Sequence, residues 1–202
     1  MTGTTESHGP EDATVTAVLV VDVQRDFLPG GALAVPDGNE VVPVLAACIE
    51  AFARDDHPIF ASRDWHPPDH CSFQASGGPW PPHCIAGSPG ATIAAALHLP
   101  ANATIIDKGR SVDQEAYSAF EGTALDAHLK DLHTRRLFIG GLATEYCVFN
   151  TALDALRLGY QVVVLKDAIR AIDRASGEQA IEKLQRRHAG FMHSAAVLDG
   201  QC

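Results

Sequence analysis

Apolar segments and segments with helical spacing alternate from one end of the chain to the other, and this alternation limits the fold more than any other feature. Residues 15–21 are a continuous, mostly aliphatic run that stops at Asp22, which is typical of a strand buried on both faces. Over residues 39–55 the apolar positions instead recur with the spacing of a helix. Further strands are predicted at residues 58–62, 103–107, 136–140, 161–165 and 189–192. Further helices are predicted at residues 91–99, 123–132, 145–158 and after Ser176, which is placed as an N-cap.

Repeated strand-helix-strand units with apolar strands require crossover connections that place helices on both faces of a sheet. We therefore predict an α/β fold, a three-layer sandwich in which a mostly parallel sheet lies between two layers of helices. The length of 202 residues fits one domain, which we place at residues 14–202, preceded by a loose polar tail at residues 1–13.

Charge and cysteine content narrow the classes of partner. The chain has 15 basic and 25 acidic side chains, a formal net charge of −10, so it is expected to bind neither nucleic acid nor an anionic membrane surface. No targeting sequence or membrane-spanning run is recognised, and we expect a cytoplasmic protein with a small-molecule substrate.

Thiols stay reduced in the cytoplasm, so a functional cysteine is expected to serve in catalysis or metal binding rather than in a disulfide. A homo-oligomer is compatible with these features.

Four residues with reactive side chains follow the predicted strands. Asp22 follows the first strand, Asp64 the second, Lys108 the third and Cys147 the fourth. In open parallel sheets, ligands bind beyond the carboxyl ends of the strands. His66 also follows the second strand, so we expect a carboxylate, a metal-binding group that includes Asp64 and His66, an amine and a thiol to share one site at this edge of the sheet.

Cys147 is the candidate nucleophile. It lies at the start of the helix predicted over residues 145–158, where the helix dipole and free N–H groups are expected to lower the pKa of the thiol. Asp22 can accept the thiol proton, and the Lys108 ammonium can stabilise the resulting anion. Taken alone, each of the three residues also fits a structural role, as a buried thiol, a turn-forming carboxylate or a solvated lysine.

A proline-rich irregular segment, residues 63–90, carries a second group of polar side chains. It offers one carboxylate and three imidazoles, from Asp64, His66, His70 and His83. Mixed oxygen and nitrogen ligands suit one divalent metal, with zinc as the first choice and iron or manganese as alternatives. A closed structural zinc site that uses Cys71 or Cys84 is the competing interpretation. We rank it lower because neighbours on an extended segment point in opposite directions, so a histidine and its adjacent cysteine rarely bind one ion.

Five motifs follow one another along the chain: VDVQRDFLPGGALAV, RDWHPPDHCSF, WPPHC, KG followed by AYSAFEG, and GLATEYCV. Together they resemble the nicotinamidase branch of the isochorismatase-like cysteine hydrolases, in which the motifs occur in the same order. The resemblance implies that Asp22, Lys108 and Cys147 form a catalytic triad. It implies metal ligands at Asp64, His66 and His83, with His70 as a ligand in some members only. It further implies an oxyanion hole formed by Ala143 and Cys147. It also implies an aromatic substrate pocket formed by Phe27, Trp80 and Tyr117.

The implied reaction is the hydrolysis of nicotinamide to nicotinate and ammonia, a step of NAD salvage, through a thioester on Cys147. Pyrazinamide, which keeps the ring nitrogen, is expected to react as well. The resemblance also places a cis peptide bond between Leu142 and Ala143. Two alternatives are a related amidase that acts on another small amide, and a catalytically silent metal-binding module on the same fold.

Overall fold

Strand β1 (Val15–Val21) lies inside a six-stranded sheet with the order β3-β2-β1-β4-β5-β6. This computed structural model describes residues 15–199, so the tail predicted at residues 1–13 lies outside the described part. The remaining strands are β2 (Ile59–Asp64), β3 (Thr104–Lys108), β4 (Thr134–Leu142), β5 (Gln161–Arg170) and β6 (Gly190–Met192). Every neighbouring pair in this sheet is parallel, which confirms the predicted parallel α/β architecture.

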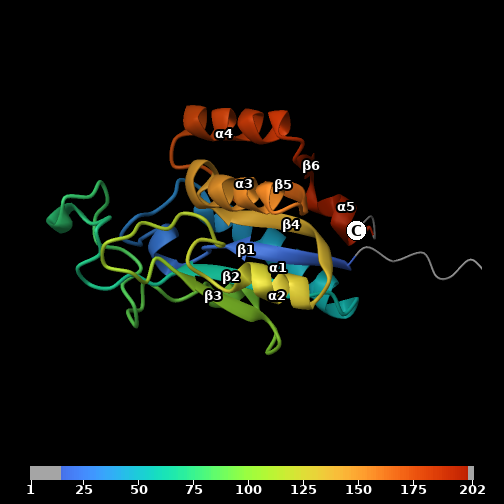
Figure 1. Cartoon of the computed structure of the whole chain (residues 1–202), viewed down its shortest axis with the longest axis horizontal. Helices are drawn as coiled ribbons and strands as arrows, with labels where there is room; N and C mark the ends of the chain where they lie inside the picture. Colours follow the sequence, from blue (N-terminus) through green and yellow to red (C-terminus); the bar gives the residue numbers. More distant parts are fainter. Residues whose placement is uncertain (1–14, 200–202) are drawn as a thin grey trace, which may run out of the picture.

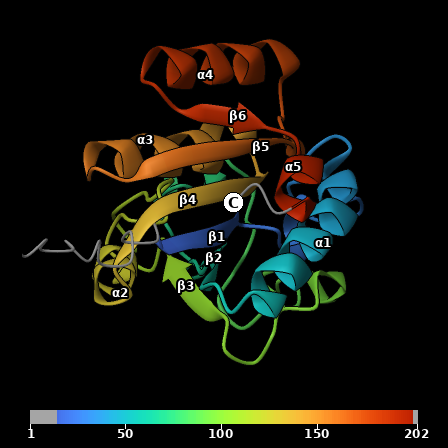
Figure 2. The same ribbon diagram turned by 90° about the vertical axis from the view of Figure 1, so that its right-hand side faces the viewer.

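Helices cover both faces of the sheet, as expected for parallel crossovers (Figures 1 and 2). One face carries α1 (Val41–Arg54) and α5 (Ser194–Leu198), and the other carries α2 (Leu125–Asp131) and α3 (Phe149–Arg157). Helix α4 (Arg174–Arg186) packs beside α3 near the β6 edge. None of the helices in residues 15–199 combines the length and apolarity needed to cross a bilayer.

The strands divide the buried apolar side chains into two cores because successive residues point to opposite faces. In β1, Val18 and Val20 pack in the core beneath α1, whereas Leu19 and Val21 pack in the core beneath α2 and α3. Burial on both faces explains why this strand reads as an unbroken apolar run in the sequence.

The helix boundaries correct three predictions. Asp173 is the N-cap of α4, and its carboxylate accepts the Ser176 N–H at 2.8 Å, so Ser176 lies inside the helix rather than at its cap. Residues 91–99 contain only a short 3₁₀ helix, Ala95–Leu97, instead of the predicted α-helix. The predicted helix at residues 145–158 consists of a π-helical turn, Thr144–Val148, followed by α3. Further 3₁₀ turns lie at Arg25–Phe27, Gly38–Glu40 and Gln74–Ser76.

The long irregular segments gather beyond the carboxyl ends of the strands (Figure 1). Between β2 and β3 the chain runs for about forty residues with only short 3₁₀ turns and isolated bridges, such as those that pair Gln24 with Ile93 and His66 with Ile85. The edge of the sheet where ligands are expected is therefore built from loops held by a rigid layer of strands.

Candidate active site

The four strand-end residues predicted from the sequence meet around one ammonium group. Asp22 follows β1, Asp64 and Lys108 are the last residues of β2 and β3, and Cys147 follows β4. The Lys108 Nζ lies 3.0 Å from Asp22 Oδ2, 2.5 Å from Asp64 Oδ1 and 3.4 Å from Cys147 Sγ. All four residues are buried. The arrangement places a cation against two carboxylates and a thiol in a site shielded from solvent.

The two oxygens of the Asp22 carboxylate have different surroundings. Oδ1 accepts a hydrogen bond from the Ser62 hydroxyl at 2.7 Å, and Ser62 is itself buried. Oδ2 is buried and faces the Lys108 ammonium, but it accepts no well-aligned hydrogen bond. This oxygen is therefore available to take a proton from Cys147, whose sulfur lies within 4.8 Å of the carboxylate. The sequence did not single out Ser62, although a serine in an otherwise apolar buried strand was a usable signal.

The state of the thiol differs from the sequence prediction. Burial raises the pKa of Cys147 well above its usual value, and the nearby Lys108 ammonium only partly opposes this effect. Burial also raises the pKa of Asp22, against the influence of Lys108. The prediction that the helix N-terminus lowers the pKa of Cys147 was wrong, because burial disfavours the thiolate and raises this pKa. The pair is better described as a protonated thiol beside a carboxylate that can accept its proton.

Lys108 and Asp64 are both charged in this site. Burial alone works to lower the pKa of Lys108, but the Asp22 and Asp64 carboxylates outweigh it and raise that pKa. Burial works to raise the pKa of Asp64, but Lys108 and His66 outweigh it and hold the pKa well below its usual range. Lys108 Nζ also donates to the Ala116 carbonyl at 2.9 Å, a fourth contact in addition to those with Asp22, Asp64 and Cys147.

The π-helical turn Thr144–Val148 carries the sulfur into a small cavity of about 30 Å³. Ala143 and Cys147 both line this cavity, and the peptide bond between Leu142 and Ala143 is cis, as the resemblance implied. Because π-helical turns are concentrated at functional sites, the turn itself is a sign of a special role for this segment.

The same cavity is lined by aromatic side chains. It includes Phe27, Trp80 and Tyr117, the three positions predicted to bind a substrate ring. The Trp80 indole N–H donates to the Tyr117 hydroxyl at 3.0 Å, and burial raises the pKa of Tyr117 to about 12. Leu33, Tyr146 and Ile172 also line the cavity and were not predicted. Tyr146 packs edge-on against Trp80, with ring centroids 5.1 Å apart. Aromatic side chains of this kind can stack against a flat ring.

Asp64, His66 and His83 form a buried group that could hold a metal, with ligand atoms within 4.8 Å of one another. The second nitrogen of each ring is already engaged, because His66 Nδ1 donates to the Gly109 carbonyl at 2.9 Å and His83 Nδ1 donates to the Pro81 carbonyl at 2.8 Å. Both Nε2 atoms therefore face Asp64 Oδ2, at 3.5 Å and 4.0 Å. Orientation of ligand imidazoles by bonds to carbonyls is typical of metal sites, so these residues fit a divalent cation.

His70 lies beside this group but is not brought into it. Its ring packs against that of His66 at 4.1 Å, while its Nδ1 contacts the Ser72 hydroxyl at 2.7 Å and its Nε2 contacts the Gln114 carbonyl at 3.1 Å. Neither Cys71 nor Cys84 joins a metal-competent group among residues 15–199, so the cysteine-based zinc site receives no support there.

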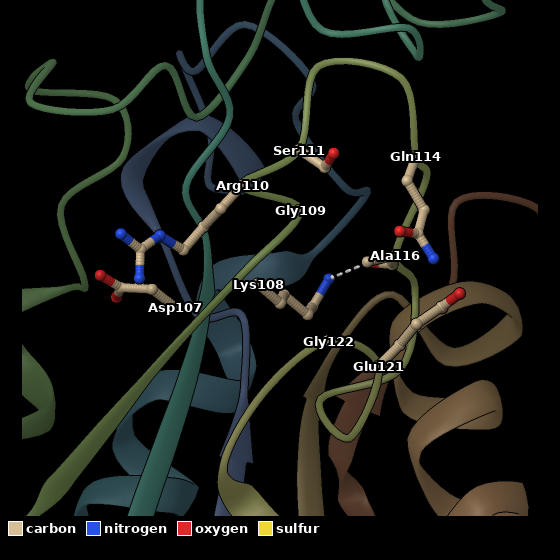
Figure 3. A pocket seen from close by; sticks show the side chains of 9 residues that line it. All are labelled: Asp107, Lys108, Gly109, Arg110, Ser111, Gln114, Ala116, Glu121 and Gly122. Carbon is tan, nitrogen blue, oxygen red and sulfur yellow. Dashed lines mark hydrogen bonds between the residues drawn. The ribbon is translucent and has the colours of Figure 1, made fainter.

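The loop after β3 holds Lys108 and His66 in place. Gly109 has a left-handed conformation with φ of 60°, and a Cβ at this position would lie 2.4 Å from the His66 ring, so a glycine is required here. Figure 3 shows Lys108 reaching toward Ala116 across this loop. A larger cavity of about 430 Å³ lies here and is lined mainly by polar and charged residues such as Arg110 and Glu121, without the nucleophile or the metal group.

Comparisons with known proteins agree with this geometry. Residues 16–196 match the isochorismatase domain model. The chain is 38% identical to the nicotinamidase of Escherichia coli (strain K12), over 86% of this chain and 92% of that protein. It superposes on the zinc complex of the Pyrococcus horikoshii pyrazinamidase with a TM-score of 0.87 and 45% identity, covering 89% and 99% of the two chains. For PnC1 of L. infantum in complex with nicotinate the TM-score is 0.85 and the identity 37%, covering 91% and 94%. The chain therefore belongs to the isochorismatase family.

Proposed function

We propose that this protein is a nicotinamidase that hydrolyses nicotinamide to nicotinate and ammonia, and that it also accepts pyrazinamide. The single observation that carries the proposal is the contact of one ammonium, on Lys108, with the Asp22 carboxylate and the Cys147 thiol. These three groups line or adjoin a small cavity with aromatic walls. Nicotinamidases and pyrazinamidases among the relatives support the choice of substrate.

Substrate binding would use the aromatic wall. The pyridine ring would lie among Phe27, Trp80 and Tyr117, with its carboxamide carbon toward the Cys147 sulfur. The amide oxygen would point toward the backbone N–H groups of Ala143 and Cys147. Donors fixed in a dry site stabilise an oxyanion without having to reorganise during the reaction.

The first half of the reaction would form a thioester. As the Cys147 sulfur bonds to the carboxamide carbon, its proton moves to Asp22 Oδ2, and the amide oxygen becomes an oxyanion. When the oxyanion collapses, the C–N bond breaks and Asp22 returns the proton to the departing nitrogen, which leaves as ammonia. Lys108 stays protonated and keeps the site from accumulating negative charge.

The second half would consume one water molecule. Asp22 takes a proton from the water as its oxygen attacks the thioester carbon, and a second oxyanion forms in the same hole. Collapse then breaks the C–S bond, the proton on Asp22 returns to the Cys147 sulfur, and the acid leaves and ionises to nicotinate. The enzyme is regenerated with the thiol protonated, the form that burial favours.

A divalent cation, with zinc as the first choice, would be held by Asp64, His66 and His83. When bound, it supplies a Lewis acid that can hold the ring nitrogen and so orient the substrate. The zinc complex of the similar pyrazinamidase supports this choice of metal.

Ammonia release from nicotinamide by the purified protein tests the proposal. We expect turnover with nicotinamide and with pyrazinamide, and none with benzamide at the same concentration, because benzamide lacks the ring nitrogen. His66→Ala is expected to lose metal and to raise KM. A metal-loaded protein that releases no ammonia from nicotinamide would leave the silent metal-binding module as the better description.

A further inference from the structure

Gln24 is a buried amide whose role the reaction scheme does not use. Its side chain is fully buried and makes three hydrogen bonds, each with a backbone group. Nε2 donates to the carbonyls of Asp64 and Ala91, both at 2.9 Å, and Oε1 accepts the N–H of Asp64 at 2.8 Å. One amide therefore satisfies both backbone groups of a single residue, the carboxylate at the centre of the metal group.

The position of Gln24 explains why such a clamp is needed. Strands β1 and β2 pair in parallel up to the bond from the Asp22 N–H to the Ser62 carbonyl, at 3.2 Å. Asp22 then turns into a left-handed conformation with φ of 49°, which takes the backbone of β1 away from β2. Without another partner, the backbone N–H and carbonyl of Asp64 that face β1 would be buried and unsatisfied. The Gln24 amide takes the place of the missing strand there.

The other side of Asp64 is fixed by β3. Asp64 and Lys108 are register partners, and the Trp65 N–H donates to the Lys108 carbonyl at 2.9 Å. The backbone of Asp64 is thus held from both neighbouring directions. Its two carboxylate oxygens can then serve different partners, with Oδ1 on the Lys108 ammonium and Oδ2 facing the imidazoles of His66 and His83.

We infer that Gln24 is a positioning residue for the metal site: its side-chain amide holds the backbone of Asp64 so that one oxygen meets Lys108 and the other meets a divalent cation. The inference rests on the metal site of the proposed function. It adds a residue that touches neither metal nor substrate and yet sets metal affinity. Partners that orient ligands in this way commonly change metal affinity by about 10- to 100-fold when removed.

Zinc binding by the full chain tests the inference without any activity measurement. The variants are Gln24→Met, which keeps the length of the side chain without its hydrogen bonds, and Gln24→Glu, which as a carboxylate keeps the acceptor for the Asp64 N–H but loses both donors. We expect the zinc dissociation constant, measured by competition with a chromogenic chelator, to rise about 10- to 100-fold in both. Circular dichroism and gel filtration establish that each variant is folded.

Ser194→Ala is the matched control, because the Ser194 hydroxyl also makes a partly buried bond, to Asp167 Oδ2 at 2.6 Å, on α5 and outside the metal group. Its zinc dissociation constant is expected to stay within twofold of the wild-type value even if its melting temperature falls. If Gln24→Met is recovered only as aggregate, Gln24→Asn, which is one methylene shorter and cannot reach both groups of Asp64, is expected to show the same loss.

The outcomes separate the two proposals. A folded Gln24→Met variant that binds zinc as tightly as the wild-type chain would overturn the positioning role and leave the proposed reaction intact. A wild-type chain that binds no zinc would overturn the metal site and the positioning role together. Retained zinc affinity with a lower melting temperature in all Gln24 variants would assign this amide to folding alone.

Discussion

Asp64 and Lys108 are register partners at the ends of two parallel strands, and their side chains also form a contact of 2.5 Å between Oδ1 and Nζ. The sheet therefore dictates the contact, because partners in parallel strands project from the same face at the same level. The ammonium also contacts Asp22, so two buried carboxylates share a single lysine as their counter-charge.

Replacing this lysine is expected to destabilise the protein. In Lys108→Met, Asp22 and Asp64 would remain buried without their counter-charge, and breaking a buried ion pair in this way commonly costs about 3–5 kcal/mol. Urea unfolding measures the change. The control is Lys130→Met, which removes an exposed pair with Asp126 and is expected to change the free energy of unfolding by at most about 0.5 kcal/mol. Equal stability of the two variants would contradict the buried network described above.

Removal of the sulfur is expected to abolish turnover. Cys147→Ala leaves no nucleophile, and losses of about 10⁴-fold or more are typical for such changes. Zinc content should stay unchanged, because Asp64, His66 and His83 hold the metal without the thiol. Ammonia release and metal analysis measure the two effects. Cys71→Ala, outside the cavity, serves as the control, and full activity in Cys147→Ala would refute the thioester route.

The hydroxyl of Ser62 is expected to set the acid limb of the pH profile. Its bond to Asp22 lowers the pKa of that carboxyl, which burial has raised. The base must be ionised to accept a proton, so activity is present above this pKa and is lost as the pH falls through it. Ser62→Ala should move the acid limb of kcat/KM toward higher pH and lower kcat about tenfold. Ser111→Ala, in an exposed loop, should leave the limb in place, and an unmoved limb in Ser62→Ala would show that Asp22 is not the titrating base.

Glu145 is expected to affect substrate binding more than chemistry. Its carboxylate accepts the N–H groups of Ile172 and Asp173, at 3.3 Å and 2.8 Å, and so ties the turn that carries Cys147 to the loop that carries the Ile172 wall. Glu145→Ala should raise KM about fivefold to tenfold, with a smaller change in kcat. Steady-state kinetics with Glu178→Ala as the control measures this. A fall in kcat alone would indicate that Glu145 acts on the nucleophile instead.

The meeting of Asp22, Asp64, Lys108 and Cys147 could be predicted because each residue ends or follows a strand, and parallel strands bring their carboxyl ends together. Local patterns were enough for that prediction. They were also enough to recognise the fold, since strands buried on both faces have a distinctive composition.

Features that depend on distant residues were not predictable in the same way. The pKa of Cys147 is decided by burial, which the local helix signal does not report. The Nε2 atom of His70 contacts the carbonyl of Gln114, a residue 44 positions away. Asp173 and Ser176 are both good capping residues, and only the extended backbone at Asp173 selects it as the cap.

The π-helical turn at Thr144–Val148 has a consequence for insertions and deletions. A π turn accommodates one residue more than an α turn, and each residue of an α-helix advances by about 100° around the axis. Deleting a single residue here would convert the turn to α-helix and swing the sulfur away from Asp22, whatever residue types remained. The length of this short segment is therefore under as strict a constraint as the identity of its cysteine.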